Sequence, residues 1–322
     1  MRTDCTVLLL SHQNEPFCTA RVADALAARG VRVLRFDTDT FPASLRLCAR
    51  LGMAQPSDNA ALFFEDEPLS VDSVWLWRLW PAQLPTQLPP EQLRAAQRES
   101  MTTLLGFLDL LGGAFWMDPP DAMAMAENKT RQLRIAQSVG LTIPPTLVGA
   151  DPQAARDFFH LYKGRVVAKL QTSLGHSMHG GGGLPTRLLR PEDLAALDGL
   201  ASCPMVFQQY VEKRYELRVA WVDGQAFVGA LDGAKCGVDW RYETTAAWQR
   251  FELPESIRVK VAALMQRLSL RQGALDFIVT PSGEHIFLEV NPHGEWGMLE
   301  RDLGLPIGAA LADALLRRGK IP

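Results

Sequence analysis

The chain has 322 residues, of which 47% are hydrophobic and 21% are charged, and its formal net charge is -3 at pH 7. This composition is typical of a globular protein of two or three domains and excludes a disordered or fibrous chain. So small a net charge gives no general attraction to nucleic acid or to an anionic membrane, so neither is expected as a partner.

Residues 1–118 are predicted to form an α/β domain. The apolar run TVLLL at 6–10 predicts a buried strand, a helix follows over 19–29, and VRVLRFD at 31–37 predicts the next strand. This spacing indicates a βαβ unit with a parallel sheet, and no GxGxxG follows the first strand, so dinucleotide binding is not expected. The remaining predicted elements of this domain are a strand, a proline-rich loop and a helix, at 71–80, 81–90 and 91–112.

A central α+β domain is predicted over residues 119–204. Leu133, Ala136 and Val139 recur at helical spacing, and Gly140 ends that helix. The next predicted elements are a strand after Pro144 and Pro145, a helix at 151–162 and the apolar strand RVVAKL at 165–170. The glycine-rich segment 175–183 is predicted to be a loop that either closes over phosphates with its backbone N–H groups or is simply disordered.

The last part of the chain, 205–322, is predicted to be an antiparallel α+β domain. Its predicted strands, helices and hairpin lie at 205–211, 216–223, 225–232, 255–270, 274–291 and 306–318. Pro281 to Glu284 is a turn cluster between two apolar runs, which is typical of a β-hairpin.

This hairpin carries two carboxylates and an amide. If its loop centres on residues 282 and 283, Thr280 faces His285, Asp276 lies opposite Glu289, and Asn291 shares a face with Glu289. The opposite face is then apolar, with Leu275, Phe277, Val279, Ile286, Leu288 and Val290. Facing carboxylates repel, and Mg²⁺ with its preference for oxygen ligands would resolve the conflict. The alternative is that both carboxylates lie at solvated strand ends.

Four cationic side chains complete the candidate site. Lys169 lies in an apolar strand where it needs an anionic partner, and Lys129 near a helix start could face the same place, although each could instead extend to water. In YELR and VDWR, Arg218 and Arg241 could neutralise phosphate, with structural salt bridges as the alternative.

The order of these features resembles the ATP-grasp superfamily. The resemblance implies that Lys129 and Lys169 contact nucleotide phosphates and that Glu216 holds the ribose hydroxyls. It also implies that Asp276, Glu289 and Asn291 bind Mg²⁺, with two ions expected. The implied adenine hinge is Gln209, Tyr210, Val211 and Glu212.

Closer resemblance is to the microviridin-type branch, the graspetide synthetases, which are related to the ribosomal-protein glutamate ligases. The strings that carry it are ENKTRQLRIAQSVGLTIPPTLV, VEKRYELRV, VDWR, LRQGALDFIVTPSGEHIFLEVNPHGEW and GLPIGAALADALL. One departure is Glu295, where members often have Gln, so the substrate side could differ.

The resemblance implies an ATP-dependent peptide ligase. A side-chain carboxylate of a ribosomal precursor peptide, with leader and core, would become an acyl phosphate, and a Ser, Thr or Lys side chain would then form an ester or amide crosslink. Arg218 and Arg241 would steady the transferred phosphoryl group. His293 and Glu295 are candidates for a base, although the alternative of structural roles is favoured for both.

Two other functions fit the same residues. One is an ATP-grasp carboxylate–amine ligase acting on free amino acids or a protein terminus, and the other is a non-catalytic ATP-binding regulator. A homodimer is implied by the family. Five cysteines without a CxxC pair, and the lack of an 18-residue apolar stretch, predict a cytoplasmic protein.

Overall fold

The computed structural model describes residues 5–15, 17–52, 62–85, 87–171, 185–242 and 245–317. The chain divides into two compact units. The first unit contains Met1–Met123, Leu270–Gln272 and Glu295–Pro322, and the second contains Ala124–Ser269 and Gly273–Gly294. Part of the last predicted domain, Glu295–Pro322, belongs to the first unit. The predicted division into three domains, at 118/119 and 204/205, stays a prediction.

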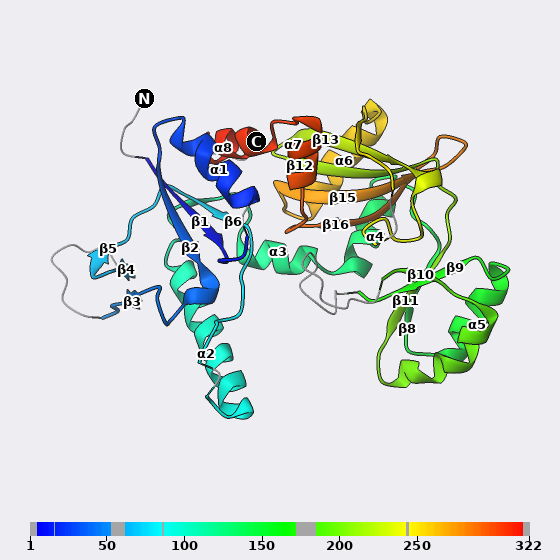
Figure 1. The fold of residues 1–322 in the computed structure, drawn as a ribbon, viewed down its shortest axis with the longest axis horizontal. Helices are drawn as coiled ribbons and strands as arrows, with labels where there is room; N and C mark the ends of the chain where they lie inside the picture. Colours follow the sequence, from blue (N-terminus) through cyan, green and yellow to red (C-terminus); the bar gives the residue numbers. More distant parts are fainter. Residues whose placement is uncertain are drawn as a thin grey trace. The chain divides into compact units, whose positions relative to one another are not determined.

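The first unit is built on a parallel sheet with the strand order β2-β1-β6-β7 (Figure 1). Its strands are β1 (Thr6–Ser11), β2 (Arg32–Asp37), β6 (Ser73–Leu76) and β7 (Phe115–Trp116), and the small antiparallel strands are β3 (Leu47–Ala49), β4 (Leu62–Phe64) and β5 (Glu67–Pro68). Every residue of β1 is buried, as expected for an apolar central strand of a parallel sheet. The predicted βαβ unit is confirmed.

Five helices belong wholly or mostly to this unit. They are α1 (Cys18–Ala27), α2 (Pro90–Asp109), α3 (Pro120–Ala126), α7 (Gly297–Leu303) and α8 (Ile307–Leu316), with the short 3₁₀ turn η1 (Thr38–Thr40). Glu15 fixes the start of α1, because its carboxylate accepts hydrogen bonds from the amides of Cys18 and Thr19, both at 2.8 Å. α8 packs against α1, so the last described helix lies beside the first (Figure 1).

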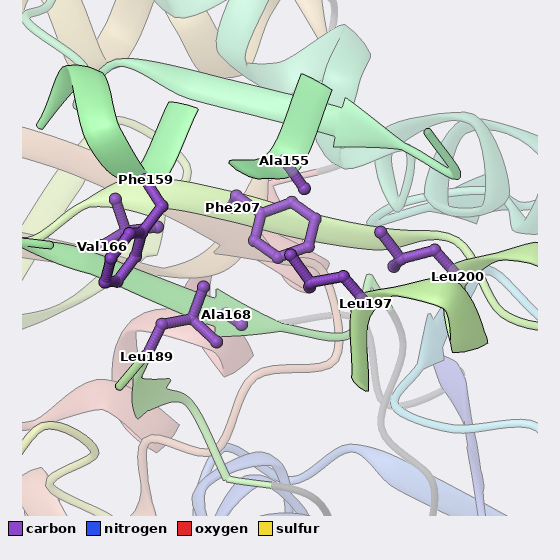
Figure 2. Close-up of a cluster of buried hydrophobic side chains, with 8 residues drawn as sticks. All are labelled: Ala155, Phe159, Val166, Ala168, Leu189, Leu197, Leu200 and Phe207. Atoms are coloured by element: carbon purple, nitrogen blue, oxygen red, sulfur yellow. The ribbon is translucent and has the colours of Figure 1, made fainter. Parts of the chain in front are cut away.

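The second unit begins with a four-stranded antiparallel sheet in the order β10-β9-β11-β8. The elements of this half are β8 (Thr146–Gly149), β9 (Val166–Lys169), β10 (Arg187–Leu188), β11 (Met205–Gln209), helices α4 (Lys129–Ser138) and α5 (Pro152–Leu161), and the 3₁₀ segment η2 (Pro191–Ala201). A cluster of buried side chains from α5, η2, β9, β11 and the residue after β10 forms its core. Figure 2 shows these residues, which are Ala155, Phe159, Val166, Ala168, Leu189, Leu197, Leu200 and Phe207.

The second sheet of this unit has five strands in the order β14-β13-β12-β15-β16. They are β12 (Tyr215–Val222), β13 (Gln225–Asp232), β14 (Gln249–Arg250), β15 (Gln272–Val279) and β16 (His285–Asn291), accompanied by α6 (Glu255–Arg267) and the turn η3 (Gly233–Lys235). The chain thus combines an α/β unit with α+β sheets, as the sequence predicts. In the part of the chain that the structure describes, no helix has the length and apolarity to cross a membrane.

The predicted hairpin forms, with one change of register. Asp276 lies opposite Glu289 as predicted, but Val279, and not Thr280, faces His285. The register shifts beside Asp276 and Phe277, because Leu288 is an extra residue in β16 and forms a β-bulge.

Between the bulge and the turn, the side chains of β16 lie on the faces opposite to those predicted, so that Phe287 pairs with Phe277 and Ile286 with Ile278. Phe287 is fully buried and its ring packs on that of Phe277 at a centroid distance of 5.5 Å, whereas Leu288 is only half-buried. The prediction that Ile286 and Leu288 share the apolar face of Phe277 was therefore wrong, because a strict two-residue alternation does not survive a bulge.

Candidate active site

The hairpin brings three oxygen-bearing side chains together. Asp276 and Glu289 are direct cross-strand partners, and the Nδ2 of Asn291 donates to Oε1 of Glu289 at 2.9 Å. The side chains of Asp276 and Glu289 are only 13% and 20% exposed. Solvated strand ends, the alternative for this pair, are therefore not what the structure contains.

Lys129 reaches this group from the start of α4. The side chain of Asn128 caps the helix by accepting from the amide of Arg131 at 2.9 Å, which fixes Lys129 as the first helical residue. Nζ of Lys129 donates to Oδ1 of Asn291 at 2.8 Å and lies 3.1 Å from Oε2 of Glu289. The side chain is paired with these groups and does not extend to water.

Lys169, at the end of β9, belongs to the same electrostatic cluster. Burial lowers the pKa of its ammonium group, Glu289 opposes that shift, and the positive charge of Lys129 adds to it. Burial disfavours ionisation of Glu289 as well, but Lys129 and Lys169 outweigh it and hold the pKa of this carboxyl well below its usual range. Glu289 is therefore a carboxylate with two cationic neighbours.

Asp276 is held by Arg218 from β12. Nη1 of Arg218 donates to both carboxylate oxygens, at 2.8 and 3.0 Å, and its side chain is 8% exposed. Burial raises the pKa of Asp276, Arg218 lowers it, and the nearby Glu289 raises it further. Arg218 therefore lies directly beside the predicted metal ligands.

Gly294, in the string NPHGEW, permits this arrangement. A Cβ at this position would lie 2.5 Å from the Cβ of Ala274 and 2.9 Å from Nη2 of Arg218. Both distances are too short for a side chain, so glycine is required for the chain to pass the Arg218 guanidinium.

Glu216 is buried on β12, two residues before Arg218, and it has a partner that the sequence did not predict. Nζ of Lys213 lies 2.6 Å from Oε2 of Glu216 and also donates to the carbonyl oxygen of Gly237 at 2.6 Å. Burial nevertheless raises the pKa of Glu216 to about 7. Lys213 stands in the charged string VEKRYELR, but the sequence did not show that its side chain pairs with Glu216.

Arg241 lies in the loop after η3 and is held by Asp239. Nε and Nη2 of Arg241 donate to the two oxygens of Asp239, at 2.8 and 2.7 Å, and the Arg241 side chain is 44% exposed. Asp239 is itself buried and accepts from the amide of Thr186 at 3.1 Å. Asp239 stands in the string VDWR, yet nothing in the spacing identified it as the partner of Arg241.

The predicted adenine hinge, Gln209 to Glu212, follows β11. The amide of Gln209 donates to the carbonyl of Pro145 at 3.0 Å, and that of Tyr210 to the carbonyl of Arg165 at 2.8 Å. The carboxylate of Glu212 points to Arg165, 3.0 Å away. If this segment is the adenine hinge, its contacts would come from backbone groups other than these two amides.

The two candidate bases already have partners. Nε2 of His293 lies 3.7 Å from Oε1 of Glu127, and Glu295 pairs with Arg78 at 2.7 Å and accepts from Sγ of Cys18 at 3.3 Å. The glycine-rich segment 175–183 lies outside the described residues.

The donor set fits magnesium. Asp276, Glu289 and Asn291 offer hard oxygen atoms on one side of a hairpin, which is the ligand type that Mg²⁺ prefers. Two carboxylates here have three close cations, Lys129, Lys169 and Arg218. An added dication needs further negative charge, which the phosphates of a nucleotide would supply.

The chain is similar to known proteins over nearly its whole length. The family model of the MvdD pre-ATP-grasp domain matches residues 6–124, while no curated protein matches the chain. Macrocyclase MdnB from Microcystis aeruginosa MRC is 43% identical, with 97% of this chain and 99% of that one covered and a TM-score of 0.81.

Two further solved structures are similar over nearly their whole length. Macrocyclase MdnC from the same organism, bound with precursor peptide MdnA, is 31% identical with coverage of 97% and 99% and a TM-score of 0.86. A Chryseobacterium gregarium RiPP-associated ATP-grasp ligase, in complex with ADP and a leader and core peptide, is 27% identical with coverage of 98% and 97% and a TM-score of 0.85. The chain belongs to the graspetide synthetases, the macrocyclase branch of the ATP-grasp ligases.

Proposed function

We propose that this enzyme crosslinks a ribosomal precursor peptide, which it recognises through a leader and modifies in a core. The observation that carries the proposal is the convergence of Lys129, Arg218, Asp276, Glu289 and Asn291 in one buried cluster, in a chain 43% identical to a macrocyclase. It is an ATP-dependent ligase, and ATP and Mg²⁺ are its cofactors.

The chemistry follows from the charges. A side-chain carboxylate of the peptide takes the terminal phosphoryl group of ATP, ADP leaves, and a hydroxyl or amine of the same peptide then displaces phosphate to form an ester or amide. Bound Mg²⁺ would offset the charge of the phosphate oxygens.

The residues of the chain have separate roles in this proposal. Lys129 and Lys169 bind phosphates, while the hinge from Gln209 to Glu212 meets adenine and Glu216 meets ribose. Arg218 and Arg241 steady the phosphoryl group, since preorganised charges account for most of the rate in such transfers. Asp276, Glu289 and Asn291 hold magnesium, as two ions in the fully loaded enzyme. A homodimer is part of the proposal.

Mass spectrometry tests the reaction. The enzyme is incubated with ATP, Mg²⁺ and candidate precursor peptides encoded near its gene, rich in Thr, Ser, Asp and Glu, and each crosslink should remove the mass of one water. Glu289→Ala should abolish that loss, because it removes a carboxylate from the magnesium ligands and takes the compensating negative charge from Lys129 and Lys169.

An exposed carboxylate in the same unit supplies the control. Glu255→Ala removes an exposed group that pairs with its helix neighbour Arg258, and it should leave the reaction unchanged. Release of ADP with a free amino acid in place of the peptide would instead identify a carboxylate–amine ligase, and nucleotide binding without any product would identify a regulator.

A further inference from the structure

Gln132 is a buried glutamine on the same face of α4 as Lys129, three residues further along the helix. Its side chain is fully inaccessible to solvent and every polar group in it is used. Nε2 donates to the carbonyl oxygens of Ala126, at 2.6 Å, and Val290, at 2.7 Å, while Oε1 accepts from the amide of Val290 at 3.0 Å.

Val290 lies between two of the proposed magnesium ligands. β16 is the last strand of its sheet, so its outer backbone groups have no neighbouring strand of that sheet to bind. Earlier in β16, Thr142 pairs with this edge, and its carbonyl oxygen accepts a hydrogen bond from the amide of Phe287 at 2.8 Å. At Val290 the amide side chain of Gln132 takes the place of a peptide group and completes both backbone hydrogen bonds.

We infer that Gln132 is a positioning residue for magnesium, in that it fixes the distance between α4 and the strand segment from Glu289 to Asn291. The inference rests on the proposed function. A second link between helix and segment is Lys129, whose ammonium group bonds the same Glu289 and Asn291 oxygens that a metal ion would use. Gln132 is neutral, and its three hydrogen bonds named above are to backbone groups. This link therefore persists when the side-chain oxygens of Glu289 and Asn291 bind a cation.

Without Gln132, the amide and carbonyl of Val290 would be buried without partners, and β16 would move to satisfy them. Glu289 and Asn291, on either side of Val290, would then move from the positions in which they bind magnesium. Outer groups that orient metal ligands usually change metal affinity by about 10–100-fold when they are removed.

The test uses Gln132→Met, which keeps the length of the side chain but has no hydrogen-bonding amide. Calorimetry measures the affinity for ADP with and without Mg²⁺. The variant should lose about 10–100-fold of the gain in ADP affinity that Mg²⁺ provides, while the affinity without Mg²⁺ stays close to that of the original protein. Hydrogen exchange at the Val290 amide should become faster.

The matched control is Gln272→Met in the first unit. Gln272 is also buried, and its Oε1 accepts from Nε1 of Trp75 at 2.7 Å, but the residue has no part in the proposed site. Its variant should lower the melting temperature and keep the full gain from Mg²⁺.

A Gln132→Met protein that melts earlier yet keeps the full gain from Mg²⁺ would overturn the inference, since Gln132 would then only stabilise the fold. Should that variant not fold, Gln132→Asn retains the amide on a shorter side chain, and the same criterion applies to it. The proposed function fails separately: it is overturned if the original protein binds ADP with Mg²⁺ but forms no crosslink in any candidate peptide.

Discussion

The buried carboxylates of the site differ in the partners that hold them. Glu289 has Lys129 and Lys169 as cationic neighbours, Asp276 has Arg218, and Glu216 has Lys213. Removing one member of such a buried pair costs about 3–5 kcal/mol, because the other charge is left without compensation. Substitutions of these residues therefore need a stability measurement beside every activity measurement.

Glu216 makes the stability of the protein depend on pH. Burial raises its pKa from 4.5 to about 7, so between these values the folded protein keeps a proton that the unfolded chain releases. The contribution of Glu216 to the free energy of unfolding therefore falls as the pH rises through this window, by up to about 3 kcal/mol at 1.36 kcal/mol per pKa unit.

Urea unfolding from pH 4.5 to 7.5, without nucleotide, measures this effect. Glu216→Gln has no group to titrate at this position, so its stability should fall less over the window than that of the original protein. Parallel pH profiles for the two proteins would contradict the prediction.

At the scale of elements, the loop after β16 is as important as the hairpin itself. Gly294→Ala should disrupt the site, because the new Cβ would press on Ala274 and on the guanidinium of Arg218. We expect a loss of about 1–3 kcal/mol in the free energy of unfolding, from overpacking, and a large fall in the crosslinking rate from displacement of Arg218.

Gly149→Ala is the matched control in the same unit. Gly149 ends β8, and a Cβ there meets nothing within 4 Å. Its melting temperature and rate should match those of the original protein, and equal rates for the two alanine variants would refute the role of Gly294.

At the scale of the whole molecule, the first unit is completed by the end of the chain. Ile307, Leu311 and Leu315 of α8 are fully buried, α8 packs on α1 and β6, and the carbonyl of Leu315 accepts from Oγ of Ser73 at 2.8 Å. Burial of three such side chains contributes about 6 kcal/mol, a large share of the stability of a typical domain.

Removal of residues 306–322 should therefore unfold the first unit. Hydrogen exchange should show that amides of β1 lose protection, while those of β12 and β13 in the second unit keep it. Asp313→Ala is the control, since the pair with Arg29 is more than half exposed on the Asp313 side and should contribute less than about 1 kcal/mol. Full protection of β1 after truncation would show that α8 is dispensable.

Much of this protein is decided by its sequence alone. The apolar runs and glycine stops predicted β1, α1, β2, α4, β9, β12 and β13, because periodicity and turn residues act locally. The opposition of Asp276 and Glu289 was predicted from a turn and a two-residue alternation, and it holds because the shifted turn register and the bulge at Leu288 offset each other. The motifs that resemble graspetide synthetases predicted the family to which the chain belongs.

Only the tertiary structure decided how the charges pair. In the chain, Arg218 and Asp276 are 58 residues apart, Lys129 and Asn291 are 162 residues apart, and Gln132 and Val290 are 158 residues apart. Local patterns do not encode such distances, since each partner is selected by the packing of separate elements. For the same reason the sequence missed the bulge at Leu288, which depends on how β15 and β16 together fit the core and which places Phe287 inside.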